Sequence, residues 1–243
     1  MKRNSIRFFK KKNYPFIAAF SDKTFNFSFR NFSKRTIRKN RKAFFDKLNI
    51  DCKDLILPQQ VHSARVVSMG KKHRGRGAFG YRAAIKRTDG LFTQEKNLPL
   101  GVLTADCLAI SLFDPATKTA CILHAGWKGS NKRIAQKAIA RLQRKYKINP
   151  KDLIVFFGPA IRSCCYEVGS EFKNYFSQRF LIRNGDKLFF DLIKANASQL
   201  LKAGVRKKNI FDCKICTCCD KRFFSYRREG KKTGRMISVI IVT

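Results

Sequence analysis

Three short apolar runs, separated only by turn residues, constrain the fold of this chain more than any other feature. They cover residues 98–104, 108–113 and 119–124. Runs of this length between turn residues are typical of neighbouring β-strands. The periodicity then becomes that of a helix over about 131–147, with one apolar stripe formed by Ala135, Ile139, Leu142 and Tyr146. A change from strand to helix periodicity over so short a stretch indicates an α/β protein.

Local patterns predict further elements on both sides of this region. Strict alternation predicts a half-buried strand over 24–29, and a charged stretch with few breakers predicts a helix over 34–48. We also expect strands over 152–157 and 235–242, and a helix between the capping residue Asp191 and Gly204. Neither an internal repeat nor a linker is evident, so we predict one α/β domain over residues 1–243.

The charge of the chain is strongly basic. Lys and Arg number 53 against 16 Asp and Glu, a formal net charge of +37. The excess extends along the whole sequence, whereas a dedicated nucleic-acid arm would form a block. We interpret it as a solvated surface that attracts nucleic acid only non-specifically. The 44% of hydrophobic residues suffices for a core, and no apolar run approaches the ~18–20 residues that span a bilayer, so no membrane partner is expected.

Cysteine usage favours a reducing compartment. The chain has nine Cys, an odd number. The apolar stretch behind the basic N-terminus covers only residues 16–20, shorter than the ~7–15 residues of a signal-peptide core. We therefore expect a cytoplasmic protein, whose cysteines serve as core fillers, metal ligands or catalysts.

Cys107 and His124 lie at neighbouring ends of two predicted strands. If residues 114–118 form the turn between these strands, Leu108 faces His124. Cys107 then falls within one residue of the position opposite His124, where Cα atoms are ~4.5–5.5 Å apart. A slip of one residue would change the faces that the side chains share, so this arithmetic predicts proximity and not side-chain direction.

A Cys and a His brought together in this way have three interpretations. They can be core residues, a nucleophile–base pair or part of a metal site. Adding His62 gives two nitrogens and one sulfur with room for a water, which is the ligand set of an open catalytic zinc site. Gly-rich turns and the neighbouring Asp106 favour a functional site over three core residues.

A second group of cysteines is crowded near the C-terminus. It comprises Cys213, Cys216, Cys218 and Cys219. Four cysteines within seven positions are awkward for one tetrahedral site, although Cys164-Cys165 could supply a separated pair. We do not expect structural zinc here.

An ordered set of motifs from about residue 55 to the C-terminus resembles the laccase-domain family. Its members were first called multicopper polyphenol oxidases. Many are now assigned as purine nucleoside phosphorylases with adenosine deaminase and methylthioadenosine phosphorylase activity, and some as peptidoglycan editing factors. The matching segments are Gln60-Val61-His62, Thr104-Ala105-Asp106-Cys107, His124-Ala125-Gly126-Trp127-Lys128-Gly129, Gly158-Pro159-Ala160-Ile161, Cys165-Tyr166-Glu167-Val168, Cys216-Thr217, Phe224-Ser225-Tyr226-Arg227-Arg228 and Thr233-Gly234-Arg235-Met236.

The resemblance implies a fold and a metal site. The fold would be a mixed α/β sandwich of β-sheets flanked by helices, similar to toxin-type cysteine hydrolases. The metal would be zinc, with copper as the alternative, and its ligands would be His62, Cys107 and His124. Cys107 and His124 would act in catalysis together with Asp106, whose carboxylate either shuttles protons or caps a turn.

The resemblance also implies substrates. They would be adenosine, inosine, guanosine and methylthioadenosine together with inorganic phosphate, and adenosine would also be deaminated. Cationic side chains match phosphate oxygens, and an aromatic ring can stack on a purine. The candidate substrate-binding residues are Gln60, Lys128, Arg227, Arg228 and Tyr226.

Three alternative functions compete with this prediction. The first is a Cys107/His124 amidohydrolase that edits peptidoglycan precursors. The second is a copper polyphenol oxidase, although one two-His, one-Cys set is far from the several coppers of a true laccase. The third is a basic RNA-binding protein without catalysis, which would show salt-dependent binding and no nucleoside turnover.

Overall fold

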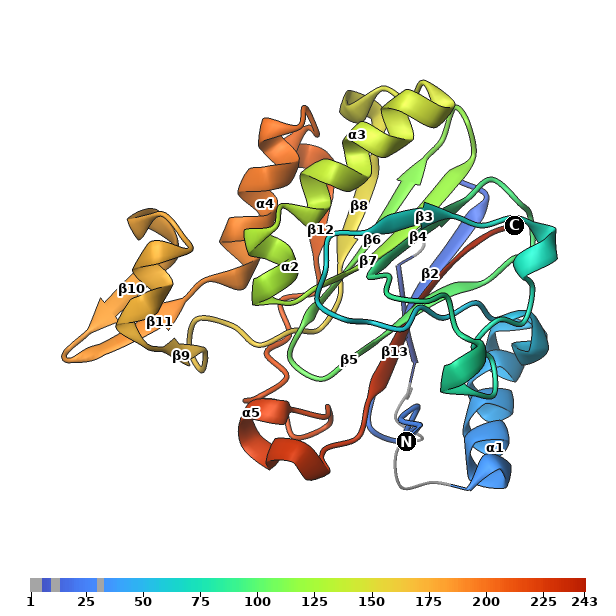
Figure 1. Cartoon of the computed structure of the whole chain (residues 1–243), viewed down its shortest axis with the longest axis horizontal. Coiled ribbons are helices and arrows are strands. Elements are labelled where there is room, and N and C mark those ends of the chain that lie inside the picture. The colour runs from blue at the N-terminus through green and yellow to red at the C-terminus, as the bar shows by residue number, and fades with distance from the viewer. Residues whose placement is uncertain (1–5, 10–13, 30–32) are drawn as a thin grey trace.

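The computed structural model describes residues 6–9, 14–29 and 33–243. Two β-sheets lie face to face, and helices cover their outer faces (Figure 1). This arrangement confirms the predicted mixed sandwich of sheets flanked by helices. The similarity to toxin-type cysteine hydrolases and the single domain over residues 1–243 stay predictions, and residues 1–5, 10–13 and 30–32 lie outside the described residues.

Six described strands form the larger sheet, and four form the smaller one. The larger sheet has the order β12 (Ile210–Asp212), β8 (Ile154–Phe157), β6 (Leu108–Asp114), β7 (Thr119–Ala125), β4 (Gly90–Thr93) and β3 (Val66–Ser68). The smaller sheet has the order β1 (Ile6–Phe9), β2 (Phe16–Ser21), β13 (Met236–Val242) and β5 (Leu100–Thr104). A separate small sheet, which projects at one side in Figure 1, contains β10 (Leu181–Asn184), β11 (Lys187–Phe190) and β9 (Glu167–Val168).

The helices occupy both outer layers. Against the larger sheet pack α3 (Ile134–Tyr146) and α4 (Leu192–Lys202), and α1 (Lys34–Phe45) packs against the smaller one. Two further helices are short: α2 (Trp127–Asn131) follows β7, and α5 (Tyr226–Glu229) precedes β13. The helices expected over 34–48 and 131–147 and after Asp191 are therefore confirmed, and the Asp191 carboxylate caps α4 by accepting from the backbone N–H of Lys194.

The central strands are apolar on both faces because both faces are buried. In β6, Leu112 points toward the layer of α3 and α4, while Phe113 points toward the smaller sheet. In β13, Val239 faces α1 and Ile240 faces the larger sheet. This double burial explains why these strands appear in the sequence as continuous apolar runs and not as alternating ones.

Three sequence predictions about strands are wrong. The segment 24–29 is not a strand, because the side chains of Asp22 and Asn26 accept hydrogen bonds from backbone N–H groups two residues ahead and bend the chain. The run 98–104 does not neighbour 108–113 in one sheet, since β5 pairs with β13. The β6–β7 register is also shifted by one residue, because Asp114 pairs with Thr119 and leaves a shorter turn.

In the part of the chain that the structure describes, no helix has the length and apolar character needed to cross a membrane.

Candidate active site

Three potential metal ligands meet at one end of the sandwich. His62 Nε2 lies 3.9 Å from Cys107 Sγ, and the ring centroids of His62 and His124 are 4.8 Å apart. One ligand atom from each of the three residues lies within 4.8 Å of the others. Two imidazoles and a thiol at this separation can share a single metal ion. The donor set therefore fits a metal.

The local backbone explains how Cys107 reaches this position. Ala109 pairs with His124, so these two side chains share one face of the sheet, and Cys107 lies two residues before Ala109 in the bend that leads into β6. The bend over residues 105–107, where Asp106 has a φ of 84°, ends β5 and directs the chain into β6. Gly126 lies opposite the thiol, and a Cβ there would come within 2.8 Å of Cys107 Sγ and 3.0 Å of His62 Cδ2. A glycine at this position therefore leaves room for the side chains of Cys107 and His62.

Asp89, at the start of β4, orients both histidines. Its Oδ1 accepts from the backbone N–H of His62 at 2.9 Å and lies 2.9 Å from His124 Nδ1. Its Oδ2 accepts from the backbone and the hydroxyl of Ser63, both at 2.7 Å. Because a carboxylate only accepts, Nδ1 of His124 donates to it, which leaves Nε2 as the nitrogen that can bind a metal once it has lost its proton. A carboxylate behind a histidine is the usual outer-shell partner in a metal site.

The surroundings of Cys107 favour the deprotonated form of its thiol. Burial alone would raise the pKa of Cys107, but the charge of His124 and hydrogen bonds from both histidines lower it to about 6. Burial alone would lower the pKa of His124, yet the charge of Cys107 and the hydrogen bond to Asp89 raise it to about 9. Both shifts favour the thiolate form of Cys107, which is the form that ligates a metal.

Asp106 points toward the C-terminal loop. Its Oδ1 accepts from the Thr217 hydroxyl and its Oδ2 from the backbone N–H of Arg227, each at 2.6 Å. The residue is 8% exposed, and each carboxylate oxygen has a hydrogen-bond donor. This geometry favours a positioning role, because Asp106 ties the loop that precedes β13 to the bend that carries Cys107.

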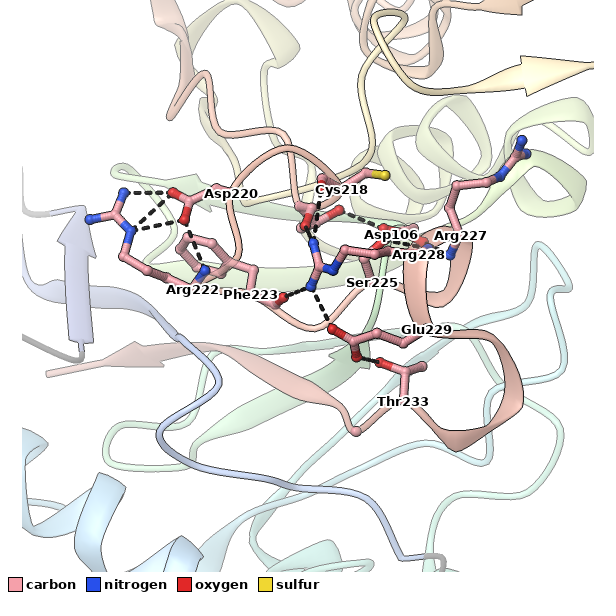
Figure 2. A network of polar contacts seen from close by, with 12 residues as sticks. Asp106, Cys218, Asp220, Arg222, Phe223, Ser225, Arg227, Arg228, Glu229 and Thr233 are labelled. Atoms are coloured by element: carbon pink, nitrogen blue, oxygen red, sulfur yellow. Dashed lines mark hydrogen bonds and ion pairs between the residues drawn. The ribbon is translucent and has the colours of Figure 1, made fainter.

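The two neighbouring arginines of this loop have different surroundings (Figure 2). The guanidinium of Arg228 donates to backbone carbonyls of Thr217, Cys218 and Phe223 and pairs with Glu229. Arg228 therefore holds the loop together. Arg227 is exposed, and its guanidinium extends away from this network and lies 5.5 Å from the ring centroid of Tyr166.

The other candidate substrate-binding residues also differ in their contacts. The amide of Gln60 is hydrogen-bonded to both the N–H and the carbonyl of Leu103, at 2.8 and 2.7 Å, so it joins the His62 segment to β5. Lys128 is exposed, with its ammonium 5.4 Å from the ring of Trp127. Tyr226 is 48% exposed at the start of α5.

Sequence reasoning missed three residues at this site. Asp89 looks like an ordinary turn residue before Gly90, and nothing local marks it as the partner of two histidines. Thr217 is separated from Asp106 by more than a hundred positions. Tyr166 belongs to a matched motif, but its place beside Arg227 appears only in the fold. Burial and the charge of Cys107 raise the pKa of the Tyr166 hydroxyl, which therefore stays protonated.

Comparison with known proteins decides the family. The model for the family described as multi-copper polyphenol oxidoreductase laccase matches residues 14–243. The chain belongs to this family. The resemblance found in the sequence motifs is thereby confirmed.

Relatives in the laccase family include named enzymes. Purine nucleoside phosphorylase YlmD of Bacillus subtilis is 33% identical over 212 residues, covering 83% of this chain and 76% of that protein. Adenosine deaminase RL5, from an unknown prokaryotic organism, is 33% identical over 203 residues, covering 80% and 77%. Among solved structures, the hypothetical protein YfiH of Bacillus licheniformis superposes with a TM-score of 0.89 at 31% identity, covering 94% and 93% of the two chains.

Proposed function

We propose that this protein is a purine nucleoside phosphorylase with adenosine deaminase activity, and that both reactions take place at the His62, Cys107 and His124 centre. The convergence of these three ligands carries the proposal. The names of the relatives, purine nucleoside phosphorylase and adenosine deaminase, supply the reaction classes. The substrates are adenosine, inosine, guanosine and methylthioadenosine together with inorganic phosphate.

The metal at this centre is zinc. Two imidazoles and a thiolate form the set of three protein ligands that leaves a fourth position open in catalytic zinc sites. A bound zinc ion supplies Lewis-acid polarisation and lowers the pKa of a coordinated water. Copper accepts the same soft and borderline ligands, but the reaction classes of the named relatives require no redox metal.

Arg227 and Lys128 bind phosphate. In phosphorolysis, a phosphate oxygen attacks C1′ of the ribose while the C1′–N9 bond breaks and its electron pair moves to the purine. A cation must hold the phosphate dianion during this attack. Both side chains are exposed, and both lie on segments adjacent to the centre: Lys128 follows the strand of His124, and the Arg227 backbone is bonded to Asp106.

Tyr166 and Tyr226 contact the purine. The leaving base carries negative charge until it is protonated, so a hydrogen-bond donor near it lowers the barrier. Tyr166 keeps its proton because burial and the charge of Cys107 raise the pKa of its hydroxyl. The exposed ring of Tyr226 offers a face for stacking. Gln60, Asp106 and Arg228 act as positioning residues, since the structure uses their polar groups to fix neighbouring backbone.

Deamination uses the same centre and a different nucleophile. The oxygen that replaces the 6-amino group of adenosine comes from water, and ammonia leaves. A zinc site that has histidine and cysteine ligands and one open position for water is suited to this hydrolysis. We place the protein in the cytoplasm, where a reducing environment keeps the Cys107 thiol available for the metal.

Product analysis tests the proposed function. Purified protein is incubated with inosine, adenosine or methylthioadenosine, with and without phosphate, and the products are separated by chromatography. We expect free base only when phosphate is present, and inosine from adenosine under both conditions. Base released at equal rates without phosphate would indicate a hydrolase and contradict phosphorolysis.

A matched variant assigns the activity to the centre. Cys107→Ala removes one ligand, so both activities should fall by on the order of 100-fold or more. Cys121→Ala is the control, because Cys121 is a buried cysteine in the same sheet that faces the α3 layer. If the two variants lose activity equally, the reaction is not located at Cys107.

A further inference from the structure

A second group of sulfur atoms lies outside the His62, Cys107 and His124 centre. Its four thiols come from two segments far apart in the sequence, the turn that follows β8 and the loop that follows β12. We name it the thiol cluster; its members are Cys164, Cys165, Cys216 and Cys219. All four sulfur atoms lie within 4.8 Å of one another. Four cysteines crowded near the C-terminus would not suit one tetrahedral site. In the fold, Cys213 and Cys218 lie outside the cluster, and Cys164 and Cys165 supply the second pair.

We infer that the thiol cluster binds one zinc ion and that this ion has a structural role. The Sγ atom of Cys219 is 3.2 Å from that of Cys165 and 3.6 Å from that of Cys164. In a tetrahedral site with Zn–S bonds of about 2.3 Å, neighbouring sulfurs lie about 3.8 Å apart. These two pairs therefore need to separate by only about 0.2–0.6 Å, and no pair of sulfurs lies more than about 1 Å beyond the tetrahedral spacing. Four thiolates in a closed tetrahedron are the ligand set of structural zinc.

Contacts that do not involve sulfur already hold the two segments together. Arg162 makes a two-pronged ion pair with Asp212, at 2.7 and 2.5 Å. Ala160 forms a parallel bridge with Cys216, and the backbone N–H of Thr217 donates to the Ala160 carbonyl at 3.1 Å. The site is thus assembled by the fold before a metal arrives, which reduces the ordering cost of binding.

The loop geometry around Cys216 also matches half of a zinc site. Cys216 and Cys219 have the Cys-x-x-Cys spacing, and the turn between them is closed by the backbone N–H of Asp220, which donates to the Cys216 carbonyl at 2.9 Å. The exposure of Cys164 and Cys219 leaves the site accessible to a metal from solution.

A metal here would stabilise residues that serve the active site. Tyr166 follows Cys165 directly, and Thr217 lies between the two cysteines of the C-terminal loop. Thr217 donates to Asp106, which in turn accepts from the backbone of Arg227. Zinc in the thiol cluster therefore fixes the spacing between the Tyr166 turn and the loop that leads to Arg227. This inference is independent of the proposed reaction, because the ligands and their geometry do not depend on the substrate.

Metal analysis in a Cys107→Ala background tests the inference, since this substitution empties the first centre. The full chain is purified with a reducing thiol and without chelator, and its zinc and iron contents are measured by elemental analysis. We expect about one zinc per chain. Adding Cys216→Ser and Cys219→Ser to the Cys107→Ala protein should lower its zinc content by about tenfold. Adding Cys213→Ser, which lies three residues from Cys216 and outside the cluster, should leave the zinc content unchanged.

Two measurements keep the inference testable if the serine variant does not fold. Cobalt bound to the Cys107→Ala protein should show the visible absorption of a tetrahedral thiolate site, and a thiol-blocking reagent should release the zinc to a chromogenic chelator. A Cys107→Ala protein with less than about a tenth of an equivalent of zinc would overturn the inference. An equivalent of iron in place of zinc would also overturn it, as would a Cys165–Cys219 disulfide in the reduced preparation.

Discussion

Asp89 contacts two of the three segments that carry the candidate ligands, those of His62 and His124. Its two oxygens accept from the backbone of the His62 segment, from the Ser63 hydroxyl and from His124. Burial raises its pKa, but the hydrogen bonds and the charge of His124 lower it to about 2, so it stays ionised at neutral pH. The sequence indicated all three ligands but not this carboxylate, because its role depends on β4 lying beside β7.

Asp89→Asn should weaken zinc binding by about 10- to 100-fold, because an amide neither holds the charge nor accepts from all of these donors. Competition with a chromogenic chelator measures the affinity. The control is Asp114→Asn. It alters a buried carboxylate at the turn of the β6–β7 hairpin, at the opposite end from His124, and should leave zinc affinity unchanged. Equal affinity in wild type and Asp89→Asn would refute the outer-shell role.

Gly126→Ala should empty the centre while the fold persists. The added Cβ would meet Cys107 Sγ at 2.8 Å and the His62 ring at 3.0 Å, so the ligands must separate. Gly80→Ala is the matched control, since a Cβ there meets nothing within 4 Å. We expect metal content at the centre to fall severalfold in Gly126→Ala alone, with circular dichroism unchanged. Full metal content in Gly126→Ala would count against the geometry described here.

At the scale of elements, sequence patterns predicted β5 to β8, β13 and the three longest helices, but they missed β2, β3, β4 and β12 and did not give the pairing of the strands. The runs over 108–113 and 119–124 became β6 and β7, yet the register was off by one, because the Asp114 side chain bonds Thr117 and tightens the turn. The joining of β5 to β13 and the approach of the 160–166 turn to the 212–220 loop depend on contacts between distant segments. No local pattern contains that information, so the sequence offered Cys164-Cys165 only as a possible second pair and did not select the four members of the thiol cluster.

Two adjacent arginines in the loop around α5 should have different roles, Arg228 in stability and Arg227 in phosphate binding. Arg228→Ala removes a guanidinium that bonds three carbonyls and Glu229, so the free energy of unfolding should fall by about 2–4 kcal/mol. Arg227→Ala removes an exposed side chain, so stability should change by less than about 0.5 kcal/mol. The KM for phosphate should rise about tenfold or more in Arg227→Ala, because a charge-assisted bond is lost. Denaturant titration and phosphate kinetics measure both quantities; an unchanged phosphate KM in Arg227→Ala would remove Arg227 from the phosphate site.

At the scale of the whole molecule, the net charge of +37 far exceeds the two cations that we propose for phosphate binding, so we interpret the excess as a diffuse surface field. Polyanions should bind, and log K should fall steeply and linearly with log salt concentration, with the same slope for unrelated RNA sequences. Filter binding at several salt concentrations provides the slopes. Sub-micromolar binding at ~0.15 M salt that prefers one RNA sequence would instead favour the RNA-binding alternative.

The central claim is that inosine is cleaved by phosphate and not by water, and the fate of the sugar tests it most directly. Inosine has no 6-amino group, so deamination cannot contribute. Turnover is carried out with phosphate in heavy-oxygen water, and the sugar product is examined by mass spectrometry, with Cys107→Ala as the control. The account predicts ribose 1-phosphate without solvent oxygen at C1′ from the wild type and almost no product from the variant. Free ribose formed in place of ribose 1-phosphate, or equal turnover by the variant, would contradict it.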